Sequence, residues 1–213
     1  MNLEKRFGDS YGDPDAKTVL IQMVDDHDLE GIESEVKTIQ TLTDLNFCLI
    51  TIKVRDWNTD LSPWPAPAVF GREGFGDGAA ATLADVLKYT GDNTKTYYLG
   101  GYSLAALFAL WAAYQTDAFK GVAAASPSVW FPGFVDYMRE HTIHADSVYL
   151  SLGDREEKTR NPVMATVGDR IRDAYEVLKG QGVNTVLEWN PGNHFKDADL
   201  RTAKAFAWVM KHG

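Results

Sequence analysis

Apolar residues follow two different spacings along the chain, and the two spacings alternate. Short runs rich in β-branched and aromatic residues are typical of buried strands, whereas apolar residues three or four apart are typical of a helix that buries one face. The range 30–42, for example, places Ile32, Val36 and Ile39 at helical spacing. The predicted strands are 18–24, 47–54, 96–99, 121–125, 147–152 and 185–189. The predicted helices are 30–42, 79–89, 104–114, 164–178 and 200–210.

Strands that alternate with helices predict an α/β fold, in which helices cover both faces of a mostly parallel sheet of about six strands. The sequence contains no repeat, low-complexity tract or linker, and a chain of 213 residues suits a single domain over 1–213. The longest stretch without a predicted element is the loop 55–78. Reactive groups in such sheets gather at the carboxyl ends of the strands, so the candidate chemistry is expected there.

The composition excludes some classes of partner. The formal net charge of -9 disfavours binding to nucleic acids or anionic membranes, which need concentrated Lys and Arg. The N-terminus lacks the apolar stretch of a signal peptide, and no apolar run approaches the ~20 residues of a membrane span, so a cytoplasmic protein is expected. Cys48 is the only cysteine and lies in an apolar run, which predicts a buried, unreactive thiol.

Ser103 is the candidate nucleophile. It follows the predicted strand 96–99 and opens the predicted helix 104–114, which is the setting of the nucleophile elbow G-x-S-x-G. The residues two before and two after the serine must be small, and here they are Gly101 and Ala105. The elbow would place the Leu104 backbone N–H beside the attacked carbonyl, as one oxyanion donor. The competing interpretation is a serine that only caps a helix.

His194 is the candidate general base. The chain order in this kind of site is serine, acid and then histidine, with the histidine in the loop after the last strand. Pro191 and Gly192 end the predicted strand 185–189, and the turn that follows would let the imidazole reach Ser103. The other interpretation is a solvated loop histidine. His141 and His144 lie in a polar stretch and are expected on the surface.

The candidate acid follows the predicted strand 147–152, where three carboxylates stand close together. Gly153 ends the strand, and the acid of such sites often lies a few residues further on. That spacing favours Glu156 first, then Asp154 and then Glu157. The acid would hold the imidazole in the productive tautomer and stabilise the imidazolium.

These motifs together resemble a known family. The segments 101–105 (Gly-Tyr-Ser-Leu-Ala), 126–130 (Ser-Pro-Ser-Val-Trp) and 192–195 (Gly-Asn-His-Phe) are similar to those of the esterase group of the α/β-hydrolase superfamily that includes enterochelin esterase and esterase D. The resemblance implies a minimal α/β-hydrolase fold and hydrolysis of carboxylic esters, with thioesters and amides cleaved by some members. Members usually begin with two further strands that form an antiparallel edge, and here the first clear strand corresponds to the third.

The surroundings of the site follow from the loops. The second oxyanion donor is expected from the Val24 or Asp25 backbone N–H, after the first predicted strand. The acidic residues there suit a helix N-terminus, which favours negative charge through its dipole, so neither a metal nor a cofactor is expected.

Aromatic side chains provide candidates for the pocket wall. Range 126–146 is too short for a cap domain, which predicts an open pocket. The loop 55–78 either covers an edge of the sheet or walls the pocket. The candidate substrate-binding residues are Trp57, Trp64, Tyr102 and Trp130.

The sequence therefore predicts a serine hydrolase that acts on a small or accessible acyl ester or thioester. Two alternatives stay open. One is a binding protein that has the hydrolase fold without catalysis, and the other is a peptidase or acyltransferase that uses the same three residues.

Overall fold

The computed structural model describes residues 8–213, and within them seven strands form one sheet in the order β1-β3-β2-β4-β5-β6-β7. Six of the strands run parallel, and β1 pairs antiparallel with β3 at the edge. The fold class therefore agrees with the prediction. The strands are β1 (Asp9–Gly12), β2 (Thr18–Val24), β3 (Phe47–Lys53), β4 (Thr96–Tyr102), β5 (Gly121–Ala125), β6 (Ser147–Gly153) and β7 (Asn184–Asn190).

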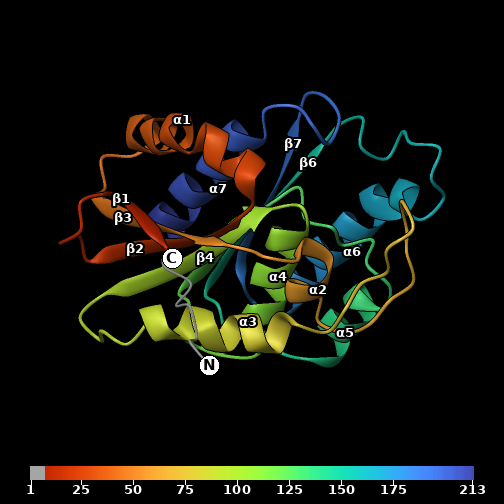
Figure 1. The fold of residues 1–213 in the computed structure, drawn as a ribbon, viewed down its shortest axis with the longest axis horizontal. Coiled ribbons are helices and arrows are strands. Elements are labelled where there is room, and N and C mark those ends of the chain that lie inside the picture. The colour runs from red at the N-terminus through yellow and green to blue at the C-terminus, as the bar shows by residue number, and fades with distance from the viewer. Residues whose placement is uncertain (1–7) are drawn as a thin grey trace.

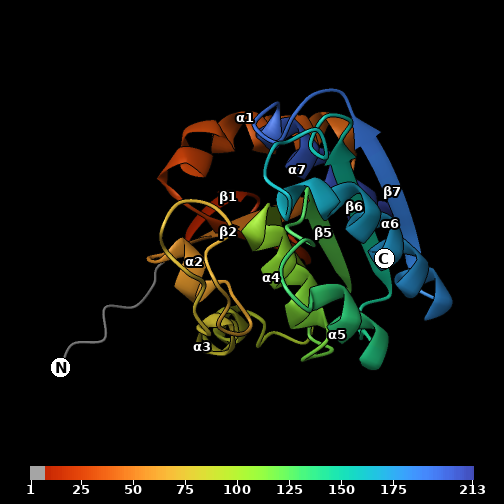
Figure 2. The ribbon, with the colours of Figure 1, turned by 90° about the vertical axis from the view of Figure 1, so that its right-hand side faces the viewer.

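Helices cover both faces of the sheet (Figures 1 and 2). One face packs against α1 and α7, and the other packs against α3, α4, α5 and α6. Each covering helix turns its apolar stripe inward, as Ile32, Val36 and Ile39 of α1 do. The helices are α1 (Asp26–Leu42), α2 (Trp57–Asp60), α3 (Ala79–Val86), η1 (Leu87–Tyr89), α4 (Leu104–Ala113), α5 (Phe134–Glu140), η2 (Met164–Thr166), α6 (Val167–Gly180) and α7 (Ala198–His212).

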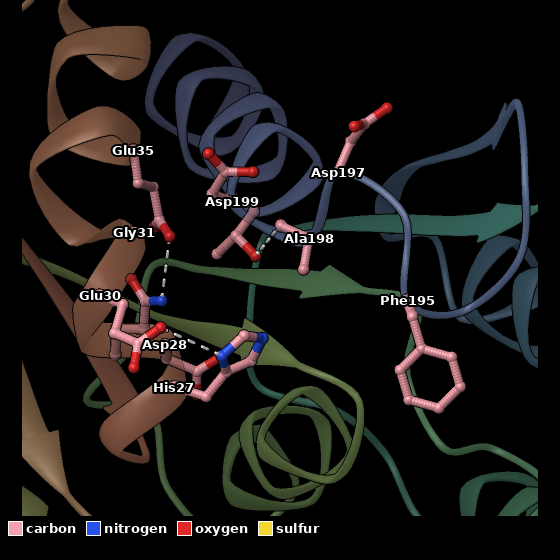
Figure 3. A pocket seen from close by; sticks show the side chains of 11 residues that line it. His27, Asp28, Glu30, Gly31, Glu35, Phe195, Asp197, Ala198 and Asp199 are labelled. Atoms are coloured by element: carbon pink, nitrogen blue, oxygen red, sulfur yellow. Dashed lines mark hydrogen bonds and ion pairs between the residues drawn. The ribbon is translucent and has the colours of Figure 1, made fainter.

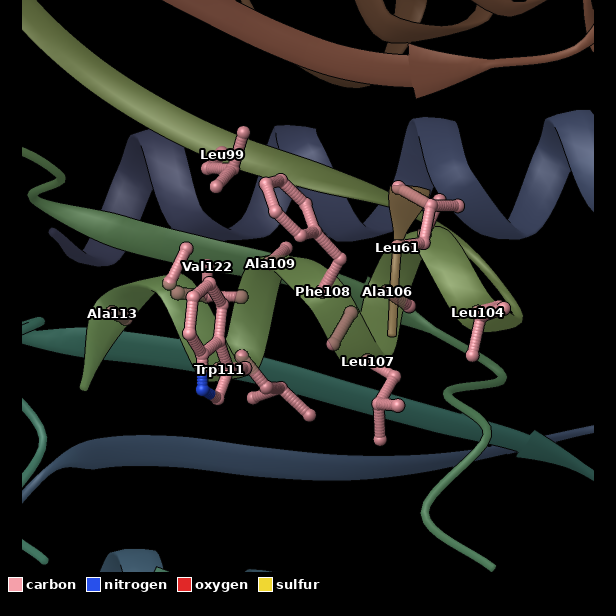
Figure 4. Packing of buried hydrophobic residues seen from close by; sticks show 14 of the residues in the cluster. Leu61, Leu99, Leu104, Ala106, Leu107, Phe108, Ala109, Trp111, Ala113 and Val122 are labelled. Carbon is pink, nitrogen blue, oxygen red and sulfur yellow. The ribbon is translucent and has the colours of Figure 1, made fainter. Parts of the chain in front are cut away.

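The helix α4 is apolar on every side. All of its residues are buried, and Leu107 and Phe108 belong to the hydrophobic core on this face of the sheet (Figure 4). A helix that is hydrophobic all round belongs in the interior of a protein. The element that follows Ser103 is therefore held tightly in place.

The sheet has one strand more than the sequence predicted. The missed strand, β1, is four residues long and mostly exposed, so it lacks the apolar run that marks the other strands. Only the seven-residue α5 stands as a helix between β5 and β6, in agreement with the absence of a cap. Within residues 8–213, no helix is both long and apolar enough to cross a membrane.

Candidate active site

Ser103 lies in a sharp turn between β4 and α4, with φ 58° and ψ −118°. A positive φ is strained for a serine, and such strain persists only where neighbouring structure imposes it. Here the Ser103 N–H donates to the Ala125 carbonyl at 3.1 Å, and the Ser103 carbonyl accepts the Ser128 N–H at 3.1 Å. Both contacts bind the turn to the end of β5. The backbone thus holds the serine hydroxyl at the carboxyl end of the sheet.

Small residues surround the turn because the chain passes close to itself. A Cβ atom on Gly101 would lie 2.7 Å from the Cβ of Ala105, and one on Gly100 would lie 2.7 Å from the Cβ of Ala123. Neither separation is possible without moving the backbone. Ala105 itself is fully buried, so the alanine at this motif position fits the space that the elbow leaves.

His194 reaches Ser103 from the loop after β7. Its Nε2 lies 3.0 Å from the Ser103 Oγ, and its Nδ1 lies 2.7 Å from Oε2 of Glu156. Gly192 in the same loop has φ 109°, a conformation that favours glycine and turns the chain back toward β4. The side chain of His194 is 22% exposed, so the imidazole borders solvent on one side.

Glu156 is buried, and each of its carboxylate oxygens has partners. Oε2 contacts His194, while Oε1 accepts from the Gly153 N–H at 2.7 Å, the Ser126 hydroxyl at 2.9 Å and the Arg201 guanidinium at 2.9 Å. Burial raises the pKa of Glu156, but the hydrogen bonds and charge of His194 and the hydrogen bonds from Gly153 and Ser126 outweigh it, so its pKa lies below the ordinary value. The carboxylate is therefore held in its charged form.

The other two candidate carboxylates point elsewhere. Asp154 Oδ1 accepts the Gly192 N–H at 2.8 Å, which fixes the start of the loop that carries His194. Glu157 Oε2 pairs with Arg172 at 3.4 Å on the surface. Of the three, the structure brings Glu156 to the imidazole.

Arg201 is a site residue that the sequence analysis missed. It lies in α7, its side chain is 1% exposed, and its Nη1 donates to Tyr102, Ser126 and Glu156. Its Nη2 donates to the carbonyls of Pro191 and Asn193 in the loop that carries His194. The sequence does contain one indication of this burial. Arg201 is a charged residue near the start of the last helix, and it lies on the same buried stripe as Ala205 and Val209.

Two serines of the 126–130 segment also reach the site. The sequence predicted no role for either of them, since the segment served only as part of the resemblance to the esterase group. The Ser126 hydroxyl donates to Glu156, and the Ser128 Oγ lies 3.2 Å from the Ser103 Oγ. Both serines are 1% exposed. The turn after β5 therefore holds the acid and borders the candidate nucleophile.

Tyr102 has a different place from the one expected. Its side chain is buried, its hydroxyl donates to the His194 carbonyl at 2.7 Å, and its ring lies 5.1 Å from the imidazole. Burial and the nearby Glu156 charge raise the pKa of Tyr102 to about 12, so it keeps its proton. The expectation that Tyr102 binds substrate does not fit this burial, and its contacts instead support the loop of His194.

The expected oxyanion donors need a correction on one side of the site. Leu104 is the first residue of α4, and its backbone N–H donates to no other residue within 8–213. The Asp25 N–H, however, donates to Asp28 in a capping box at the start of α1, so it is already used. Val24 lies within the ladder between β2 and β3. The next two amides, those of Asp26 and His27, donate to no other described residue.

Two of the three tryptophans expected to wall the pocket, Trp64 and Trp130, pack into an aromatic cluster on the α5 side of the molecule. Trp64 donates its indole N–H to the Pro132 carbonyl at 2.9 Å and packs on Phe131 and Phe134. Trp130 is buried against Phe75. Trp57, in α2, is half-buried against the same core. These rings bind the loop 55–78 to the segment after β5, so they do not cover the edge strand β1.

Three other residues lie apart from this group. Cys48 is buried, as predicted. His141 stacks on Tyr137 at the surface, and His27 lies at the rim of a cavity beside the loop of His194.

Comparisons with known proteins place this geometry in a familiar fold. No protein-family model and no curated protein matches the sequence. Among solved structures, the chain is similar to an IroE-like serine hydrolase from Shewanella oneidensis, with a TM-score of 0.73 at 13% identity, over 92% of this chain and 71% of that one. It is also similar to the siderophore hydrolase EstA from Aspergillus nidulans, with a TM-score of 0.68 at 17% identity, over 95% and 86% of the two chains.

A third similar structure is the enterobactin esterase FES from Shigella flexneri, with a TM-score of 0.63 at 13% identity. The match covers 95% of this chain and 54% of that one, so this chain spans about half the length of the Shigella protein. At these identities the comparisons establish the fold alone. The chain therefore shares the α/β fold of these hydrolases and esterases.

Proposed function

We propose that this protein is a serine hydrolase that cleaves carboxylic esters or thioesters through an acyl-enzyme on Ser103. The observation that carries the proposal is the continuous chain of contacts from the Ser103 Oγ through His194 to Glu156, at 3.0 and 2.7 Å. Side chains this close, with the nucleophile in a strained turn, match the requirements of nucleophilic catalysis.

The acylation step uses the imidazole as a base. His194 Nε2 takes the proton of the Ser103 hydroxyl as the oxygen attacks the ester carbonyl, and it then gives that proton to the departing alcohol or thiol. Glu156 accepts a hydrogen bond from the His194 Nδ1–H, keeps its negative charge, and so stabilises the imidazolium that forms. Deacylation repeats the sequence with water in place of the serine, and it releases the acid.

The negative charge on the attacked oxygen needs backbone donors. The Leu104 N–H, at the start of α4, is one of them. For the second we propose the Asp26 or His27 N–H at the start of α1, because the Asp25 N–H is bound to Asp28. Both helices would then direct their positive N-terminal ends toward the developing oxyanion.

A fluorophosphonate probe tests this proposal because it reacts with an activated serine and mimics the tetrahedral intermediate. The probe is expected to label the protein once, at Ser103 by peptide mass mapping. Ser103→Ala should abolish labelling. Ser128→Ala is the matched control, because the Ser128 hydroxyl lies only 3.2 Å from that of Ser103. It should still be labelled, since His194 Nε2 contacts the Ser103 hydroxyl.

A panel of acyl esters, thioesters and amides then separates the hydrolase from the alternatives. We expect hydrolysis of p-nitrophenyl acetate, and the panel includes enterobactin because one similar structure is an enterobactin esterase. The absence of both labelling and hydrolysis would support a binding protein without catalysis. Labelling with cleavage of amides alone would support a peptidase.

A further inference from the structure

A cavity of about 380 Å³ opens beside the loop of His194, between the starts of α1 and α7 (Figure 3). The side chains that line it have no part in the mechanism above. Its walls carry side chains from β2, α1 and α7, and Phe195, the residue after His194, stands at its edge with 88% of its surface exposed. The volume falls within the range of small-molecule sites, which is roughly 300–1,000 Å³.

Two buried polar side chains in this cavity each have one oxygen atom without a hydrogen-bond partner among residues 8–213. Gln22 and Glu35 are 2% and 3% exposed, and the Gln22 Nε2 donates to Glu35 Oε2 at 3.3 Å. The remaining oxygen of each, Gln22 Oε1 and Glu35 Oε1, has no hydrogen-bond partner among the described residues. Buried polar atoms without partners are uncommon in folded proteins and point to an unseen donor.

The cavity is also strongly acidic. Its acidic lining residues are Asp28, Glu30, Glu35, Asp197 and Asp199, and no lysine or arginine among residues 8–213 lines it. Asp28 and Asp199 lie in the first turns of α1 and α7, where the helix dipole accounts for a negative charge. Glu35 lies well inside α1 (Asp26–Leu42), so the dipole gives no reason for it.

Helix packing does not explain Glu35 either. Its neighbours on the buried stripe of α1 are Ile32, Val36 and Ile39, and burial raises the pKa of Glu35 well above its ordinary range. A bound cation would offset that desolvation. Within residues 8–213, no group of His, Cys, Asp or Glu side chains is arranged to hold a metal ion. A primary ammonium group fits better, because its three N–H donors can reach acceptors that are spread around a cavity.

The cavity lies within reach of the candidate nucleophile. Gln22 pairs with Gly100 on β4, and Ser103 is three residues further along that chain. β4 ends at Tyr102 and the chain turns at Ser103, so at the rise of a strand this backbone separation is at most about 10 Å. A substrate with its ester carbonyl at Ser103 could therefore extend past Phe195 and place a group against Gln22 and Glu35.

We propose that this cavity binds a primary ammonium group, and that the enzyme selects esters that carry such a group about 10 Å from the ester carbonyl. The selection of esters rests on the proposed function, whereas the binding of the ammonium group does not.

Direct binding tests the cavity independently of catalysis. Isothermal titration of the protein with n-hexylammonium is expected to show saturable binding at one site, and n-hexanol and hexanoate should not bind there. Glu35→Gln and Gln22→Leu should each weaken hexylammonium binding about tenfold or more, since hydrogen bonds to charged groups contribute strongly. Glu33→Gln is the matched control, because it makes the same substitution at an exposed position of the same helix.

Binding that is absent, or that Glu35→Gln and Gln22→Leu leave unchanged, would overturn the proposal. Tighter binding of hexanoate than of hexylammonium would also overturn it, since it would make the cavity an anion site. Thermal unfolding of each variant shows whether it is folded, and Gln22→Leu tests the site on its own if Glu35→Gln does not fold.

Kinetics then test the selection of substrate. The p-nitrophenyl esters of 8-aminooctanoate and nonanoate differ only in a terminal ammonium or methyl group. We expect kcat/KM to favour the ammonium ester about tenfold in the native protein. This preference should vanish in Glu35→Gln and persist in Glu33→Gln. If neither ester is hydrolysed, the proposed function fails, while the titrations still decide whether the cavity binds a cation.

Discussion

Arg201 holds a full positive charge where water does not reach it. Its side chain is 1% exposed and touches Glu156, Tyr102 and the carbonyls of the loop that carries His194. Taking a charged pair out of water is costly, and its mutual attraction balances this cost only where the geometry is good. The planar fork of a guanidinium can serve several acceptors at fixed angles, as it does here. Arg201 thus holds Glu156 and the loop of His194 in place, which in the proposed mechanism makes it a positioning residue.

Removing this guanidinium should be costly for stability. Arg201→Leu leaves the Glu156 charge buried beside an apolar side chain, so we expect the free energy of unfolding to fall by about 3–5 kcal/mol in urea titrations. Glu156→Gln removes the partner charge, so the double variant should lose less than the sum of the two single variants. Additive losses would mean that the two side chains do not interact in solution.

The three carboxylates after β6 should differ sharply in their effect on activity. Glu156→Gln should lower kcat by about 10⁴, because the imidazole loses the group that holds its tautomer. Asp154→Asn keeps an oxygen for the Gly192 N–H, and Glu157→Gln alters a surface pair with Arg172, so both should retain most of the native kcat. If Asp154→Asn lost most of its kcat while Glu156→Gln lost little, the acid would be Asp154, and the assignment of Glu156 would be wrong.

Asp28 should make stability depend on pH. Burial raises the pKa of Asp28 from its ordinary value of 3.8 to about 6, so the folded state favours the protonated acid. The stability that Asp28 contributes is complete below about pH 4 and is lost as the pH rises through about 6. As the pH is raised from 4 to 8, we therefore expect the free energy of unfolding of Asp28→Asn to increase by about 2 kcal/mol relative to that of the native protein.

The control for this measurement is Asp26→Asn. Its side chain is 83% exposed on the same turn, so this variant makes the same substitution at a position that is not buried. Equal pH profiles for Asp28→Asn and the native protein would show that the burial of Asp28 has no such effect.

At the scale of the elements, the junction of β4 and α4 is a crowded part of the site. Ala105 is fully buried, and its Cβ faces the bare Cα of Gly101 across the turn. Both small residues were recognisable from the sequence, because the elbow requires them at fixed spacing. The strained φ of Ser103 and the two hydrogen bonds to the end of β5 were not, because they depend on the neighbouring strand.

A larger side chain at this junction should disturb both stability and activity. We expect Ala105→Leu to lower the free energy of unfolding by about 1–3 kcal/mol, because overpacking forces backbone shifts, and to reduce esterase activity by moving Ser103. Ala84→Leu, on the exposed face of α3, is the control and should leave both nearly unchanged. If Ala105→Leu unfolded at the same denaturant concentration as the native protein, the junction would have space for the larger side chain, which would contradict this prediction.

The elements that the sequence concealed share one property, which is a weak local pattern. The strand β1 is four residues long and exposed, so only its pairing with β3 makes it a strand. The helices α2 and α5 are four and seven residues long, too short to show a clear period. The longer elements were predictable because each buries a continuous stripe or run against the sheet.

At the scale of the whole molecule, the parallel sheet brings the ends of β4, β6 and β7 to one edge and so assembles residues that are far apart in the chain. Ser103 and His194 were predictable from their places after strands. Arg201 was not, because its role appears only once α7 packs beside the ends of β5 and β6. The misplaced oxyanion donor, Asp25, has the same origin, since its N–H is used by a cap that forms with α1. The sequence thus predicts which strand each site residue follows, but it does not predict the contacts that form when the elements pack together.

The most direct test of the account is the activity of Ser103→Ala toward p-nitrophenyl acetate, measured beside its fold. The variant should unfold at nearly the native denaturant concentration, because the substitution removes one half-buried hydroxyl. Its kcat should fall by about 10⁶, the typical loss for the nucleophile of such a triad. A folded Ser103→Ala that keeps more than about a tenth of the native kcat would contradict the account, because a nucleophile cannot be removed at so small a cost.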